Sequence, residues 1–164
     1  MLMKDPVFPV PSSLIEKACS FSDYFVGHVF ELGDGIVIRT GQLNHPNGAC
    51  GYRIEFAGKS IAICTDTEHY EGRIDENVVE LAKESDVMVY DSAYTPEEYS
   101  KFKGWGHSTW EEAIKVAEEA DVKQTFLFHH DPSHNDEKMD EIAKEAAAVR
   151  EGVRPAIEGE EIEL

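Results

Sequence analysis

Residues 104–136 constrain this chain most strongly, because they join a polar turn, an amphipathic helix and an apolar strand in direct succession. The turn is Gly-Trp-Gly-His-Ser-Thr, and the short strand-like segment Thr-Phe-Leu-Phe over residues 125–128 is followed at once by His129 and His130. In open α/β sheets, ligands collect at the carboxyl ends of the strands. We therefore expect an α/β fold in which this histidine pair borders a site.

The rest of the chain alternates between strand-like and helix-like segments. Strands are expected around residues 26–30, 36–38, 52–56, 60–64 and 87–90, with a final edge strand within residues 155–164. Helices are expected after the capping residues Asp75, Thr95, Ser108 or Thr109, and Asn135 or Asp136. We expect a single domain over residues 1–164, with an extended segment and a short helix over residues 1–23.

The charge balance is strongly acidic, with 33 Asp and Glu against 15 Lys and Arg and a net charge of −18. Such a surface repels phosphate backbones and suits cations, so nucleic acid is not the partner that the composition favours. No apolar run is long enough for a membrane span, and the first residues lack an apolar signal core. A cytoplasmic protein is therefore expected.

Several histidines and aspartates follow the predicted strands or precede a predicted helix: His45, Asp66, Asp91, His107, His129 and His130. If these residues converge at one sheet edge, they offer the imidazole and carboxylate ligands of zinc, manganese or iron. Each also has a simpler explanation, as a loop residue, a strand-end cap or a hydrogen-bonding group. Because side chains alternate along a strand, at most one of His129 and His130 faces the site.

From about residue 7 to residue 148 the chain resembles the C-terminal half of metallo-β-lactamase-fold hydrolases. The phosphodiesterase-like members and the transfer-RNA 3′-end processing endonucleases are the most similar branch. The matching residues are His45 in Leu-Asn-His-Pro, Asp66 in Thr-Asp-Thr-Glu-His, Asp91 in Val-Tyr-Asp-Ser-Ala-Tyr, His107 in Gly-His-Ser-Thr and His129 in Leu-Phe-His-His-Asp-Pro. The resemblance implies half of an αββα sandwich, a mixed β-sheet with helices on its outer face.

The resemblance also implies roles for these residues. His45 and His129 would each bind a divalent metal, zinc first with manganese or iron as alternatives, and Asp66 would bridge the two ions. His107 would protonate a leaving group, while Asp91 fixes its tautomer and raises its pKa. The implied reaction is hydrolysis of a small phosphodiester or ester substrate by a metal-bound hydroxide. His130 is the alternative to His129 as a ligand.

The chain departs from the family in one large respect. Family members carry a His-x-His-x-Asp-His motif in an N-terminal half, whereas these 164 residues contain no His-x-His. Two functional alternatives follow: a metal-dependent hydrolase with reduced activity in this chain alone, or a non-catalytic binding module that keeps the scaffold. Half of a layered fold would also leave an apolar sheet face uncovered, so we expect a homo-oligomer or a complementary N-terminal-half chain.

Overall fold

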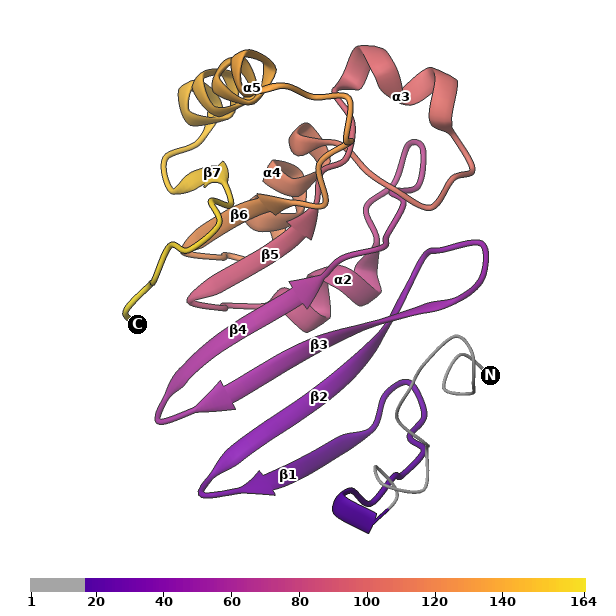
Figure 1. Ribbon diagram of the computed structural model, residues 1–164, viewed down its shortest axis with the longest axis vertical. Helices are drawn as coiled ribbons and strands as arrows, with labels where there is room; N and C mark the ends of the chain where they lie inside the picture. The colour runs from indigo at the N-terminus through magenta and orange to yellow at the C-terminus, as the bar shows by residue number, and fades with distance from the viewer. Residues whose placement is uncertain (1–16) are drawn as a thin grey trace.

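A computed structural model of the protein describes residues 17–164 and contains a seven-stranded sheet in the order β1-β2-β3-β4-β5-β6-β7 (Figure 1). Strands β1 to β4 pair antiparallel, and β4 to β7 pair parallel. The bounds are β1 (Val29–Gly33), β2 (Ile36–Leu43), β3 (Ala49–Phe56), β4 (Lys59–Cys64), β5 (Val87–Asp91), β6 (Gln124–Phe128) and β7 (Val153–Pro155). The expected mixed sheet of an α/β fold is confirmed.

The helices begin at the capping residues that the sequence offers. They are α2 (Glu76–Ala82), α3 (Pro96–Phe102), α4 (Trp110–Glu119) and α5 (Asp136–Val149). The side chains of Asp75, Thr109 and Asn135 each accept a hydrogen bond from a backbone N–H in the first turn of α2, α4 and α5. Such bonds satisfy donors that a helix leaves free at its start. No helix of residues 17–164 is long and apolar enough to cross a membrane.

The core lies between the sheet and three helices. Side chains of α2, α4 and α5 pack against one face of the sheet, as expected when right-handed crossovers connect neighbouring parallel strands. On the strands, the buried members of this core include Leu43, Ala62, Cys64, Met88, Tyr90 and Leu127. The resemblance predicts helices on the outer face of the sheet, and the positions of α2, α4 and α5 confirm this expectation.

The opposite face of the sheet carries a second set of apolar side chains, which alternate with the core residues. Pairing places Ile38 beside Ile54 and Ile54 beside Ile61, and it places Tyr52 beside Ile63 and Ile63 beside Val89. All six are only partly buried. We call these six residues the open face. None of α2, α4 and α5 lies on it, since the core residues on the alternate strand positions contact those helices.

Two expectations need correction or fall outside the described residues. The final strand is β7 at Val153–Pro155, and residues 156–164 form no strand. Val153 is 3% exposed and Gly152 has a φ of +81°, so the chain turns sharply after α5 and pairs with β6 before the acidic tail begins. Most of the predicted N-terminal segment, residues 1–16, lies outside the described residues.

Candidate metal centre

The candidate ligands are brought together by the direction of four strands. Strands β2, β4, β5 and β6 all run the same way, because two antiparallel pairings separate β2 from β4 and parallel pairings connect the others. Their carboxyl ends therefore lie at one edge of the sheet. His45 follows β2, Asp66 follows β4, Asp91 ends β5 and His129 follows β6.

The ligand atoms at this edge lie close together. One ring nitrogen each of His45 and His107 and one carboxylate oxygen of Asp66 lie within 4.8 Å of one another, as do ligand atoms of Asp91, His107 and His129. His129 Nε2 is 3.5 Å from Asp66 Oδ1, which joins the two groups. The five residues that match the family motifs thus lie at one site, and His130, the sixth candidate, belongs to neither group.

Two of these residues have an unusual backbone conformation. Asp66 has a φ of 59° and His129 a φ of 65°, in the left-handed region that few residues other than glycine adopt. Backbone strain of this kind concentrates at functional sites, where the surrounding structure enforces it. His129 follows the last residue of β6 directly. Because its backbone has left the strand conformation, the direction of its side chain does not follow the alternation of side chains along β6.

His129 and His130 occupy different surroundings. His129 is in the cluster and its side chain is 41% exposed. His130 belongs to neither ligand group, and it lines a cavity of about 400 Å³ with Met139 and Arg154. Burial lowers the pKa of His130, and both of its ring nitrogens are buried without a side-chain hydrogen-bond partner in the described part of the chain. The geometry thus favours His129 of the two.

Asp91 holds His107 through a buried carboxylate. Asp91 is fully buried, and its Oδ2 accepts hydrogen bonds from His107 Nδ1 at 2.8 Å and from the backbone N–H of Thr67 at 3.3 Å. Its Oδ1 accepts from the backbone N–H groups of Ser108 and Ala93. The hydrogen bond that His107 donates to the Asp91 carboxylate raises the pKa of His107, against the opposing effect of burial. Nε2 of His107 is left as the free ring nitrogen.

Glu68 supports the site although the sequence pattern assigned it no role. Its carboxylate accepts hydrogen bonds from Tyr99 Oη and Gly104 N, both at 2.7 Å, and from Gly106 N at 2.9 Å. Burial opposes the ionisation of Glu68, but these hydrogen bonds outweigh it and lower the pKa of the carboxyl. The bonds fix the loop that precedes His107.

The same loop packs directly on His45. A Cβ atom added to Gly106 would lie 2.2 Å from Cδ2 and 2.6 Å from Nε2 of His45, which is far closer than atoms can approach. Gly106 also has a φ of +94°. Only glycine satisfies both conditions without displacing the ring.

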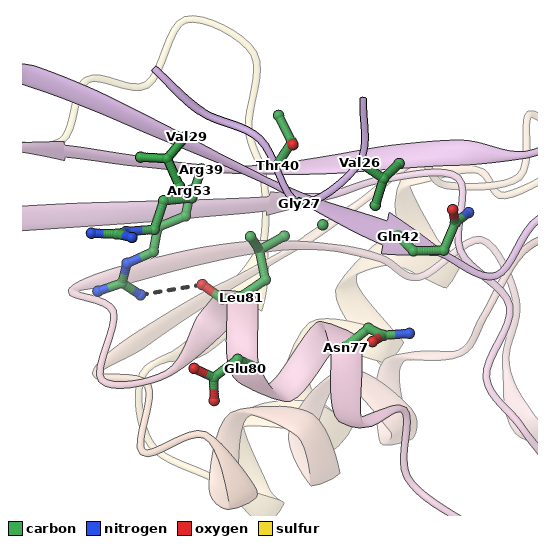
Figure 2. Close-up of a pocket in the computed structure, with 11 residues that line it drawn as sticks. Val26, Gly27, Val29, Arg39, Thr40, Gln42, Arg53, Asn77, Glu80 and Leu81 are labelled. Atoms are coloured by element: carbon green, nitrogen blue, oxygen red, sulfur yellow. Dashed lines mark hydrogen bonds between the residues drawn. The ribbon is translucent and has the colours of Figure 1, made fainter. Parts of the chain in front are cut away.

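A separate cavity of about 330 Å³ lies between α2 and strands β2 and β3 (Figure 2). Its walls include Arg39, Arg53, Glu80 and Leu81, and Arg53 donates a hydrogen bond to the Leu81 carbonyl at 3.2 Å. None of the five clustered residues lines it. This cavity is therefore distinct from the candidate metal centre.

The chemistry of the donor set fits a divalent cation. Imidazole and carboxylate groups from different parts of the chain have ligand atoms within 4.8 Å of one another, and these are the ligand types that zinc, manganese and iron sites use. The side chains of His129 and Asp66 remain partly accessible, at 41% and 48% exposed.

The chain is similar in sequence to proteins named ribonuclease Z. A ribonuclease Z from Cyanothece sp. is 32% identical over 126 residues, which cover 75% of this chain and 35% of that protein. A ribonuclease Z from Enterococcus faecalis is 27% identical over 165 residues, covering 91% of this chain and 53% of that protein. The chain thus spans from about a third to about half of the length of these relatives. These relatives are ribonucleases by name, in partial conflict with the expectation that nucleic acid is not a partner.

Solved structures and a family profile agree on the fold. The metallo-beta-lactamase fold protein YhfI from Bacillus subtilis superposes with a TM-score of 0.68 at 18% identity, over 81% of this chain and 50% of that one. The short form of human tRNase Z gives a TM-score of 0.54 at 22% identity, over 63% of this chain and 39% of that one. The profile of the beta-lactamase superfamily domain matches residues 13–130. The chain therefore belongs to the beta-lactamase superfamily and carries part of the metallo-β-lactamase fold.

Proposed function

We propose that this chain provides ligands and the proton donor of a metal-dependent hydrolase that acts on phosphodiester or ester bonds. The observation that carries the proposal is the His107–Asp91 pair, held by a 2.8 Å hydrogen bond at the edge where His45, Asp66 and His129 converge. The names of the ribonuclease Z relatives favour phosphodiesters over other esters.

His45, Asp66 and His129 are the residues that would hold metal. When bound, a divalent cation polarises a phosphoryl or carbonyl oxygen and lowers the pKa of a coordinated water. The carboxylate of Asp66 lies close to both His45 and His129, which suits a bridging role. Zinc is the first candidate, with manganese and iron as alternatives.

His107 would move a proton to the leaving group. Its Nδ1 is hydrogen-bonded to the carboxylate of Asp91, which holds the ring in one orientation, so that in the protonated form of His107 the second proton is on Nε2. Asp91 is buried and cannot rotate freely, because backbone N–H groups bind both of its oxygens. A protonated His107 donates its Nε2 proton to the oxygen that departs, and Asp91 stabilises the ring in the charged form.

We infer that this chain alone binds metal weakly. The two ligand groups have three members each among residues 17–164, and they share His107. If His107 acts as the proton donor and not as a ligand, only two ligands remain in each group. Full activity would then require further ligands, from a complementary N-terminal-half chain.

The test is hydrolysis of bis-p-nitrophenyl phosphate with added zinc or manganese, together with metal titration by calorimetry. His107→Ala should lower turnover by about 10²-fold or more, the usual contribution of a general acid, and leave metal affinity unchanged. His130→Ala is the matched control and should change neither. Loss of metal binding together with turnover in His107→Ala would make His107 a ligand and contradict its assignment.

A second candidate function, a non-catalytic binding module, is favoured by the absence of His-x-His from the sequence. Stable protein that neither binds zinc or manganese nor hydrolyses the substrate would support that alternative.

A further inference from the structure

Trp105 presents an exposed indole ring beside the candidate metal centre. It precedes Gly106 and His107, and 63% of its surface is exposed. The second tryptophan of the chain, Trp110, is 6% exposed and belongs to the core. A large aromatic side chain in water at the rim of a site is a position where a ligand ring can gain contact area.

The backbone on both sides of Trp105 is fixed. Glu68 accepts a hydrogen bond from Gly104 N through Oε1 and another from Gly106 N through Oε2, at 2.7 and 2.9 Å. Glu68 is 8% exposed, and its own backbone exchanges hydrogen bonds with Asn44, the residue before His45. The carboxylate of Glu68 therefore binds the backbone on both sides of Trp105, and the backbone of Glu68 connects this loop to the loop that contains His45. An aromatic ring whose loop is already ordered before the ligand arrives loses little conformational entropy on binding.

An aromatic series continues from Trp105 to His107. Trp105 meets Phe102 in a perpendicular contact at 5.3 Å, Phe102 stacks on Tyr94 at 4.4 Å, and the rings of Tyr94 and His107 are 6.2 Å apart. Among residues 17–164, Phe102 is the one aromatic ring in contact with Trp105. The perpendicular contact supports the indole and leaves room for a second ring to stack on it.

We propose that Trp105 is the stacking surface for a nucleobase of the substrate. This proposal rests on the proposed hydrolase function and names the substrate class, a nucleotide-sized phosphodiester. Every base has a π-face, and stacking on an exposed aromatic ring needs no particular base. The net charge of −18 disfavours tracking along a long phosphate backbone, so a short substrate held by its base and one phosphodiester fits this surface better.

The test compares adenosine 5′-monophosphate with ribose 5-phosphate, which has the phosphate without the base, in the presence of zinc. The nucleotide should quench tryptophan fluorescence saturably, and ribose 5-phosphate should not. Calorimetry should show about tenfold weaker nucleotide binding in Trp105→Ala and near-normal binding in Trp105→Phe. Quenching should disappear in Trp105→Phe, because the remaining tryptophan, Trp110, is buried. Phe56→Ala is the control, since Phe56 is 52% exposed at the opposite end of the sheet.

Equal binding of the two ligands, no saturable quenching, or unchanged nucleotide affinity in Trp105→Ala would overturn the proposal. A change of solution mass in Trp105→Ala with no change in nucleotide affinity would also overturn it and assign Trp105 to a protein contact. Binding is measured without turnover. A failure of the hydrolase proposal would appear as absent hydrolysis while base-dependent binding persists, so the two failures are distinguishable.

Discussion

At the scale of single residues, Gly106 couples the loop before His107 to the ligand histidine His45. Gly106→Ala would push a methyl group into the His45 ring, because the added carbon would lie 2.2 Å from Cδ2. We expect zinc affinity to fall by about 10- to 100-fold, as when the support of a metal ligand is lost, measured by calorimetric titration. The nuclear magnetic resonance signals of the His45 ring should shift as well.

Gly104→Ala is the matched control for this prediction. Gly104 has a similar φ of +86°, but an added carbon there would meet nothing within 4 Å. Both variants should lose about 1 kcal/mol of unfolding free energy from the strained backbone, and only Gly106→Ala should lose metal affinity. Equal metal affinity in the two variants would show that His45 is not a ligand or that its ring moves freely.

Single residues also show which parts of the site geometry follow from the sequence. The positions of His45, Asp66, Asp91 and His129 were predicted to converge because each follows a strand, and the geometry of the sheet brings them together. Glu68 was missed because two of its three partners are backbone N–H groups of glycines more than thirty residues away in the sequence. No side-chain pattern marks such partners, although a carboxylate close to Asp66 was a possible signal.

At the scale of elements, Asp86 joins the starts of three parallel strands. Asp86 immediately precedes β5. Its side chain accepts a hydrogen bond from the backbone N–H of Ser60 in β4 at 2.9 Å and another from Nζ of Lys123, which precedes β6, at 2.7 Å. The Lys123 hydrogen bond is the main cause that lowers the pKa of Asp86. Asp86→Asn should reduce the unfolding free energy by about 1 kcal/mol at pH 7, since the pair is partly screened by solvent.

The sign of the pH dependence follows from this lowered pKa. Ionised Asp86 stabilises the fold fully above its unfolded pKa of about 4, and the contribution is lost as the pH falls through the lower folded pKa. The stability difference between the wild type and Asp86→Asn should therefore shrink below about pH 4, as measured by urea unfolding at several pH values. Glu141→Gln, which removes an exposed pair with Lys138 on α5, is the control and should have little effect at any pH. A difference that stays constant down to pH 2 would contradict the pKa argument.

Elements differ in how well the sequence predicts them. The starts of α2, α4 and α5 were predictable because Asp75, Thr109 and Asn135 are local capping signals. Strand β7 was placed too late in the chain. Its position depends on the pairing of Thr125 with Val153, a long-range contact, and the alternating tail after Pro155 imitates a strand.

At the scale of the whole molecule, the open face is the feature that most needs explanation. Its isoleucines lie on neighbouring strands in register, with Ile38, Ile54 and Ile61 in one row and Ile63 in the next. Large apolar patches on a protein surface mark contacts with another protein surface. In the αββα sandwich that the family resemblance implies, a second sheet would cover this face. We therefore propose that a second copy of the chain lies on this face, where the layered fold has its second sheet.

Ile54→Lys tests this proposal, because Ile54 pairs with both Ile38 and Ile61 at the middle of the face. In a free monomer the new charge reaches water and costs little. In an assembly through this face it would be buried without a partner, which is strongly unfavourable. Light scattering at micromolar concentration should show a dimer or larger species for the wild type and a monomer for Ile54→Lys. Val149→Lys adds the same charge at a 62% exposed position on α5 and should leave the assembly intact. Wild-type protein that remains a well-behaved monomer would exclude self-association, and the complementary chain would be the remaining way to cover the sheet.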